Sequence, residues 1–407
     1  MDAKSPEVAP ASITSGHLLQ LDGLRGVAIL LVMVYHFCLP HPGFHGHSSG
    51  FLLQWAQGGW MGVDLFFVLS GFLITGILVE TREQRHYFRN FLARRFLRIW
   101  PLYYLSLLLL VVLVPMAMST TPPELQSMRE EQAWFWLYGA NWLFALEGGF
   151  SRTSGGYFWS LAVEEQFYLL WPLVVYWLAP ARVLRLSAIL LFVSLASRWV
   201  LIHSGVGSGA LYTMTFTHLD GLAVGAFVAI ALRSPEAPRL VRYAPAAGVL
   251  AAVVLVAIRI LDGDLFFWSR NMATYGYTGI AILCGSLLVA VMHARARPRA
   301  LLNRVFSNGF LRRCGKYSYA LYMVHVPVTS MSYPLVARLL REWKPILGEE
   351  AVFLASAATA FVLSWALAWL SWHLFEKRVL ALKRHFTYLE GPATAEVDHR
   401  AAHRLSN

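Results

Sequence analysis

The chain has 407 residues, of which 57% are hydrophobic and only 14% are charged, and its formal net charge is +11. A soluble protein of this length needs more charge to cover its surface, so composition excludes an ordinary soluble domain. Apolar runs of about 17 to 25 residues, long enough to cross a bilayer, recur along the sequence and predict an all-α polytopic membrane protein. The basic residues cluster in short stretches between these runs, which is typical of positive-inside anchoring and not of nucleic-acid binding.

Eleven segments are apolar enough to be considered as membrane spans: residues 24–39, 60–79, 99–118, 133–147, 161–179, 184–202, 216–232, 243–261, 272–292, 317–340 and 351–375. The segment 133–147 is short and rich in Trp and Tyr, as interfacial or re-entrant pieces are. If it does not span, the basic stretches 81–98 and 293–316 both face the cytoplasm, as the positive-inside rule requires. We therefore expect about ten transmembrane helices in a membrane domain at 21–385, with cytoplasmic tails at 1–20 and 386–407.

The first predicted span carries two ionisable side chains, Arg25 and His36. Their spacing of eleven residues is three helical turns plus about 20°, so both lie on one stripe, roughly 16 Å apart along the axis. Ionisable residues inside spans are rare and usually face a protein interior or a water-filled cavity. Arg25 alone is explained by snorkelling to the headgroups, but together the two predict one wall of a polar path.

Further polar side chains fall on the later spans. Near the inner face we expect Asp22, Arg94, Arg95 and Arg98, and deeper we expect Asp64, Glu164, Glu165, Asp220 and His325. Taken singly, the arginines are explained as topology determinants and His325 as a helix–helix hydrogen-bond partner. The carboxylates Glu164, Glu165 and Asp64 are harder to explain, because burying them without a role costs several kcal/mol.

No metal centre is predicted. Cys38, Cys284 and Cys314 show neither a disulfide framework nor zinc spacing. His41 and two further histidines lie in the stretch "HPGFHGH", but Gly and Pro make this loop flexible and no Cys or acidic residue lies beside it.

Six motifs, taken in order, resemble the membrane acyltransferase-3 family. They are Arg25 and His36 with ten residues between them, "GVDLFFVLSGFLIT", "RRFLRIWPLYY", "WSLAVEEQFYLLWP", "LDGLAVGA" and "YSYALYMVH". The resemblance covers about residues 18–385. It implies an integral protein of the bacterial inner membrane that moves an acyl group, usually acetyl, from cytoplasmic acyl-coenzyme A to a hydroxyl of a glycan, antibiotic or lipid-linked sugar.

The resemblance also implies that His36 and Arg25 are the catalytic pair and that Arg95 and Arg98 form an Arg-x-x-Arg signature. Some similar proteins carry a fused extracytoplasmic esterase-like domain, which we expect this chain to lack because it ends about thirty residues after its last predicted span.

Acyl transfer to an alcohol needs a base, stabilisation of an oxyanion and a grip on the donor. A neutral imidazole, His36, suits the base, and Glu164, Glu165 and Asp64 are candidates to orient it or to contact the acceptor. Guanidinium groups match the phosphates of acetyl-CoA or another acyl-CoA bidentately, which makes donor-binding candidates of Arg94, Arg95 and Arg98, with Asp22 beside them. Candidates to bind the hydroxyl acceptor, whether glycan, lipid-linked or small, are Asp220, Tyr168, His325 and Tyr319.

A secondary transporter or exporter is the alternative, since it also needs ionisable residues along a path. Transporters often show internal repeats, and we find none between residues 21–180 and 181–380. A membrane scaffold without chemistry leaves Asp64, Glu164, Glu165 and His36 unexplained. The acceptor, the acyl chain length and the oligomeric state stay open.

The charge bias yields a topology prediction. A reporter fused after residue 300 is expected to read cytoplasmic and one fused near residue 150 extracytoplasmic, because only this arrangement puts both long basic stretches inside. Paired enzymatic reporters active on opposite sides of the membrane measure this directly. A cytoplasmic signal near residue 150 contradicts the arrangement.

Overall fold

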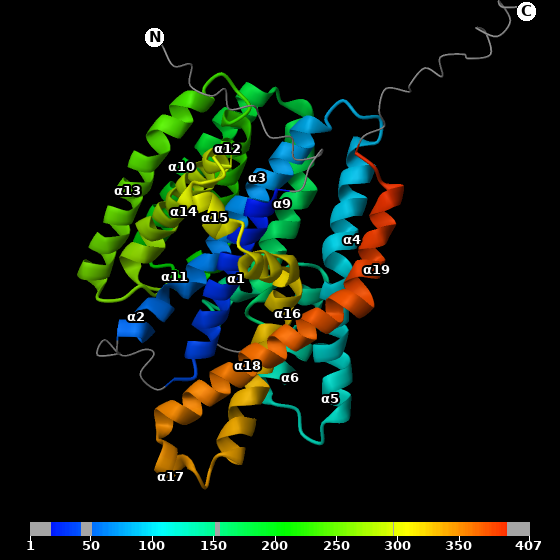
Figure 1. Ribbon diagram of the computed structural model, residues 1–407, viewed down its shortest axis with the longest axis vertical. Helices are drawn as coiled ribbons and strands as arrows, with labels where there is room; N and C mark the ends of the chain where they lie inside the picture. The colour runs from blue at the N-terminus through cyan, green and yellow to red at the C-terminus, as the bar shows by residue number, and fades with distance from the viewer. Residues whose placement is uncertain (1–17, 42–50, 151–154, 296, 389–407) are drawn as a thin grey trace, which may run out of the picture.

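The computed structural model describes residues 18–41, 51–150, 155–295 and 297–388, and in these ranges the chain forms helices and no strands (Figure 1). Seven helical segments of the described chain are long and apolar enough to cross a membrane: Leu19–Cys38, Leu53–Glu80, Tyr87–Ala117, Pro180–His203, Ala237–Asp262, Met272–Ala294 and Glu349–His385. The protein is therefore an all-α, multi-pass membrane protein, as composition predicts.

Three more of the predicted spans coincide with helices that are shorter or more polar. They are α9 (Phe158–Trp177), α12 (Asp220–Ala231) and α16 (Gly309–Leu339). Helix α12 has only 12 residues, α9 contains two glutamates and α16 begins with a basic stretch. The count of about ten spans and the side on which the termini lie stay predictions.

The doubtful segment 133–147 does not form one continuous helix. It folds as α7 (Gln132–Trp136) and α8 (Ala140–Leu146), too short for either to cross a bilayer. Tyr138 lies between them with a φ of 55°, which a right-handed helix cannot accommodate. Helix α8 then packs against α9 and α11 (Ser208–Thr213) inside the protein.

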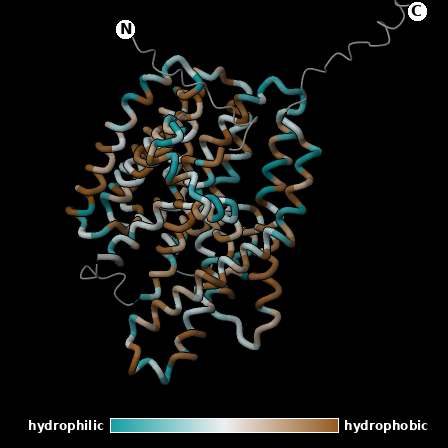
Figure 2. Tube along the Cα trace, in the orientation of Figure 1, coloured by the Kyte–Doolittle hydropathy of each residue, from teal (hydrophilic) through white to brown (hydrophobic). Residues whose placement is uncertain are grey.

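The remaining elements, in chain order, are α1 (Leu19–Cys38), α2 (Phe51–Gln57), η1 (Gly58–Met61), α3 (Gly62–Glu80), α4 (Tyr87–Leu107), η2 (Leu108–Leu113), α5 (Val114–Ala117), α6 (Pro123–Glu130), α10 (Pro180–His203), α13 (Ala237–Asp262), η3 (Met272–Gly276), α14 (Tyr277–Ala294), α15 (Leu301–Phe306), α17 (Lys344–Leu347), α18 (Glu349–Ser371), η4 (Trp372–Glu376), α19 (Lys377–Ala381) and η5 (Leu382–His385). In Figure 1, α10, α12, α13 and α14 gather on one side of α1, and α4 and α19 lie side by side on the other. Figure 2 shows teal, hydrophilic stretches along α4 and α19, whereas α13 is largely brown and apolar.

Helices α1 and α16 make a very close central contact. A Cβ atom added at Gly26 of α1 would lie 2.1 Å from the carbonyl oxygen of Leu311, and one added at Gly315 of α16 would lie 1.9 Å from that of Asp22. Glycine is needed at both positions because the backbones touch, as small residues allow between membrane helices. This contact fixes the polar stripe of α1 against the polar side of α16.

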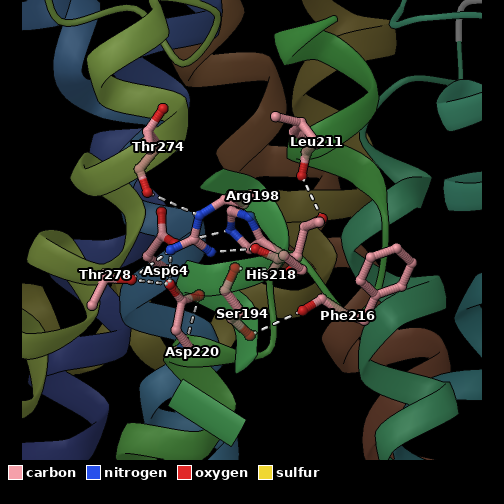
Figure 3. Close-up of polar contacts among 12 residues, drawn as sticks. Asp64, Ser194, Arg198, Leu211, Phe216, His218, Asp220, Thr274 and Thr278 are labelled. Carbon is pink, nitrogen blue, oxygen red and sulfur yellow. Dashed lines mark hydrogen bonds and ion pairs between the residues drawn. The ribbon is translucent and has the colours of Figure 1, made fainter. Parts of the chain in front are cut away.

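A second polar contact is built from four buried ionisable side chains: Asp64 of α3, Arg198 of α10, Asp220 of α12, and His218 just before α12 (Figure 3). Thr278 of α14 joins it through hydrogen bonds with Arg198 and Asp220. Nη2 of Arg198 lies 2.9 Å from Oδ2 of Asp220, and Nε2 of His218 lies 3.0 Å from Oδ1 of Asp64. All four side chains are fully buried. Arg198 also donates to the carbonyls of Thr217 and Thr274, so its charge is matched and its donors are largely used.

This buried charge cluster predicts a stability effect. Arg198→Met keeps the length of the side chain but leaves Asp220 buried without its cation, which typically costs about 3–5 kcal/mol. Thermal unfolding in detergent should therefore shift to a clearly lower midpoint, and the double variant Arg198→Met, Asp220→Leu should recover part of the loss because no charge is left unpaired.

The matched control is Arg239→Met, because Arg239 pairs with Glu236 on the surface, where the two side chains are 76% and 54% exposed. Exposed pairs contribute only about 0–1 kcal/mol. Equal midpoints for Arg198→Met and Arg239→Met would show that the cluster does not hold these helices together.

Candidate active site

Two histidines from the central helices meet at the site. His36 of α1 and His325 of α16 have ring centroids 4.7 Å apart and planes at 80°. Nδ1 of His36 lies 2.8 Å from the carbonyl oxygen of Val32, and 3.3 Å from Nε2 of His325. Nδ1 of His325 lies 2.8 Å from the carbonyl oxygen of Tyr322. The close α1–α16 contact thus produces a chain of ring nitrogens and carbonyls.

The carbonyls assign the tautomers of both rings. A carbonyl only accepts, so Nδ1 of His325 carries a proton and its Nε2 is an acceptor when the ring is neutral. For the same reason Nδ1 of His36 carries a proton, which it shares between Val32 and His325. Nε2 of a neutral His36 is then unprotonated, and it makes no hydrogen bond within the described chain. This nitrogen is free to act as a base or a nucleophile.

His36 lines a cavity of about 880 Å³, here called the aromatic cavity. Aliphatic side chains and nine aromatic rings line it, and the rings are Tyr35, Trp60, Phe150, Tyr157, Trp159, Tyr212, Phe267, Trp268 and Tyr322. Apolar and aromatic surfaces with a few polar groups are typical of binding sites for organic ligands. The aromatic cavity therefore offers His36 a place to meet a bound molecule.

The other end of α1 lines a second cavity of about 730 Å³, here called the basic cavity. One carboxylate, Asp22, and seven basic side chains line it: Arg25, Arg95, Arg98, Arg312, Arg313, Lys316 and Lys383. The guanidinium groups of Arg25, Arg95 and Arg98 make no hydrogen bond or ion pair with the described residues, and Nε of Arg95 is buried without a partner. Such a surplus of unpaired positive charge predicts a polyanionic ligand.

A third cavity of about 90 Å³, the narrow cavity, lies between the other two. Arg25, Arg95 and Arg98 line it together with the basic cavity, whereas Val63 and Tyr322 line it together with the aromatic cavity. The Tyr322 hydroxyl donates to the carbonyl of Tyr157 at 3.0 Å and lies 2.6 Å from Oγ of Ser160. The three cavities therefore follow one another along the Arg25–His36 stripe, and Tyr322 stands at the junction nearest His36.

The two adjacent glutamates of α9 point in different directions. Glu164 lines the narrow cavity and accepts from Oγ of Ser70 at 2.6 Å, while the Tyr168 hydroxyl donates to Ser70 at 3.0 Å. Glu165 instead faces α4 and accepts from Nε1 of Trp100 at 3.2 Å, and it lines none of the three cavities. Successive helical residues are rotated by about 100°, which gives the two glutamates different surroundings.

Several of the predicted site residues lie outside the three cavities or have their polar group bound to another part of the protein. Asp64 and Asp220 are in the buried charge cluster and line none of the three cavities. Tyr319 lines the narrow cavity, but its hydroxyl donates to the carbonyl of Ile99 at 2.7 Å. Arg94 faces the C-terminal segment, and His325 contacts His36 instead of a cavity. The sequence indicates the depth of such groups but not which neighbour each of them faces.

Other residues of the site were missed from the sequence. The sequence predicts only a role in topology for Arg312, Arg313 and Lys316, although they line the basic cavity. Tyr322 lies three residues after Tyr319 and three before His325 on the same helix, and that spacing is the signal that could have revealed it. The aromatic wall gave no signal, because its rings come from segments far apart in the sequence.

The histidine-rich loop is only partly described. His45 and His47 lie outside the described residues, and Nε2 of His41 lies 3.0 Å from Oε1 of Glu350. Within the ranges that the structure covers, no three His, Cys, Asp or Glu side chains converge as metal ligands would.

Comparison with known proteins gives the family. A family model described as an acyltransferase domain matches residues 18–369. Peptidoglycan O-acetyltransferase OatA of Listeria monocytogenes is 29% identical over 352 residues, which cover 82% of this chain and 53% of that protein. O-acetyltransferase OatA of Staphylococcus aureus is 28% identical over 345 residues, which cover 81% and 53%.

The chain thus spans about half the length of the curated relatives it matches. No solved structure matches it. The family model covers most of the chain, including both central helices and the residues that line the three cavities, except Trp372 and Lys383. The chain therefore belongs to the acyltransferase-3 family of membrane proteins.

Proposed function

We propose that this protein is an O-acyltransferase that moves an acetyl group from cytoplasmic acetyl-coenzyme A to a hydroxyl of a glycan on the far side of the bacterial inner membrane. The observation that carries the proposal is the series of three cavities, with unpaired guanidinium groups at one end and an unprotonated histidine nitrogen at the other. Membership of the acyltransferase-3 family favours this function over a secondary transporter.

The basic cavity is the proposed site for the donor's nucleotide. Coenzyme A carries a pyrophosphate and a further phosphate, and arginine forks bind such groups bidentately. Arg25, Arg95 and Arg98 have no competing partner among the described residues, so they can turn to phosphate without breaking an ion pair. The thin thioester arm would then extend through the narrow cavity, past Glu164 and Tyr168, toward His36.

The aromatic cavity is the proposed site for the acceptor. Aromatic rings present apolar faces and polar edges, which suits the alternating apolar and hydroxyl surfaces of a sugar. The names of the OatA relatives make peptidoglycan the first glycan to test. Glu124 and Ser330 on the cavity wall can bind hydroxyl groups of such a ligand.

His36 is the proposed base or nucleophile of the reaction. Nε2 of His36 removes the proton of the acceptor hydroxyl while the oxygen attacks the thioester carbonyl; the C–S bond then breaks and the coenzyme A thiolate takes the proton from the imidazolium. In the covalent variant, Nε2 attacks the thioester carbon, the C–S bond breaks and coenzyme A leaves as the thiolate. The acceptor hydroxyl then attacks the acyl-imidazolium, the C–N bond breaks, and the hydroxyl proton passes through the released Nε2 to the thiolate. Both routes need the tautomer that Val32 and His325 favour.

His36→Gln tests the proposal. Glutamine keeps the size and hydrogen bonding of histidine but cannot accept a proton at neutral pH, so turnover should fall about a hundredfold to ten-thousandfold. The measurement is transfer of labelled acetyl from acetyl-coenzyme A to purified peptidoglycan fragments by the protein in vesicles. Label retained on the protein without acceptor, and lost in His36→Gln, would favour the covalent route.

The matched control is His373→Gln. Nδ1 of His373 lies 2.8 Å from the carbonyl of Trp369, four residues earlier, just as His36 contacts Val32, but His373 is exposed and lines no cavity described above. A folded His36→Gln protein that transfers acetyl as fast as His373→Gln would overturn the proposed role of His36.

His325 is proposed as a positioning residue, because it reaches the reacting atoms only through His36. His325→Phe keeps a ring but loses the acceptor for Nδ1–H of His36, and a hydrogen bond to a charged group is typically worth about 1.5–3 kcal/mol. Turnover should therefore fall roughly tenfold to a hundredfold with an unchanged Michaelis constant for acetyl-coenzyme A. His325→Gln should restore most of the turnover, since its amide oxygen can accept the same bond. Equal losses in both variants would favour a purely packing role.

A further inference from the structure

The segment Lys383–Tyr388, here called the C-terminal strap, is bound to α4 by side chains of that helix. Nη1 of Arg94 donates to the carbonyl of Lys383 at 3.2 Å and to that of Phe386 at 3.0 Å. The Arg94 guanidinium also lies 4.5 Å from the centre of the Tyr388 ring. One turn earlier on α4, Nδ2 of Asn90 donates to the carbonyl of Thr387 at 2.7 Å. Asn90 and Arg94, one helical turn apart, therefore contact the strap at both of its ends.

The strap brings one basic side chain into the basic cavity. Lys383 lines that cavity, whereas Leu382, Arg384 and His385 around it are exposed. The Lys383 ammonium makes no hydrogen bond or ion pair with the described residues. In Figure 1, α19 runs beside α4, and the residues that follow α19 also contact α4.

The adjacent residues Arg94 and Arg95 of α4 therefore have different surroundings. Arg95 faces the basic cavity, with Nε buried and unpartnered, while Arg94 turns to the strap. Lys383 is held beside the unpaired guanidinium groups of Arg25, Arg95 and Arg98, and like charges in a partly buried site repel one another. The strap contacts hold Lys383 in place against this repulsion, and an anion with several charges would neutralise the group.

We propose that the C-terminal strap is a donor-binding element of the basic cavity, in which Arg94 and Asn90 are positioning residues that hold Lys383 against a phosphate of the nucleotide-thioester donor. This inference rests on the proposed function. In this proposal Arg94 does not contact the donor; it holds the strap that carries Lys383. It also assigns a binding residue beyond residue 369, where the match to the family model ends.

Binding of coenzyme A to the purified full chain in detergent, measured by calorimetry, tests the proposal with Lys383→Met, Arg94→Ala and the double variant. Lys383→Met keeps the apolar stem, and loss of one charge-assisted contact should weaken binding about tenfold. Arg94→Ala should weaken binding by a similar factor. The double variant should be no weaker than either single one, because both changes remove the same contact. Turnover at saturating donor should stay near that of the wild type.

Two controls make the result specific. Arg384→Met removes an exposed charge from the same strap and should leave coenzyme A affinity unchanged. Asn90→Ala removes a single strap contact and should weaken binding in the same direction as Arg94→Ala, which keeps the test open if Arg94→Ala fails to fold. Coenzyme A that lacks its 3′-phosphate shows which phosphate Lys383 contacts. If Lys383 binds the 3′-phosphate, Lys383→Met should leave the affinity for this analogue unchanged. If Lys383 binds the pyrophosphate, Lys383→Met should weaken binding of the analogue by the same factor as binding of coenzyme A.

Arg98→Ala separates this proposal from the proposed function. If Arg98→Ala weakens coenzyme A binding while Lys383→Met and Arg94→Ala do not, the strap proposal is overturned and the donor site stands. If the double variant shows the product of the two single effects, Arg94 does not act through Lys383 and the proposal is again overturned. If the wild-type protein does not bind coenzyme A, the proposed function fails before the strap is in question.

Discussion

The cost of placing charge inside an apolar helix bundle governs this structure. A charged group at membrane depth must find an opposite charge or face a cavity. Arg198 pairs with Asp220, and His218 with Asp64, and these fully buried pairs join α3, α10 and α12. Arg25, Arg95 and Arg98 instead line a cavity, and their guanidinium groups make no ion pair with the described residues. The same physical constraint thus separates charges that hold the fold together from charges that are available to a ligand.

Helix α1 connects the two ends of the proposed reaction path. Its close contact with α16, which glycine at positions 26 and 315 permits, sets His36 against His325 and puts Arg25 in the basic cavity. Because both residues are on one rigid helix, the spacing between the donor end and the histidine is set by helical geometry, at roughly 16 Å. Loops that could change this spacing are absent from the stripe between Arg25 and His36.

The direction in which a side chain points from its helix decides its surroundings as much as its position in the sequence does. Glu164 faces the narrow cavity while Glu165 bonds to Trp100, and Arg95 faces the basic cavity while Arg94 bonds to the C-terminal strap. In each pair the residues are neighbours in sequence and of the same charge. A rotation of about 100° gives them different surroundings and different proposed roles.

The fold class and the stripe that carries Arg25 and His36 could be predicted from the sequence. Long apolar runs determined an all-α membrane protein, and helical periodicity placed Arg25 and His36 on one stripe, because both depend only on local chain geometry. Which neighbour each polar group faces was decided only by the tertiary structure. Asp64 and Asp220 were indistinguishable from cavity residues until His218 and Arg198, from distant segments, were seen beside them. Lys383 lines the basic cavity on a strap that Arg94 of α4 contacts, and contacts between residues almost 300 positions apart leave no local pattern in a sequence.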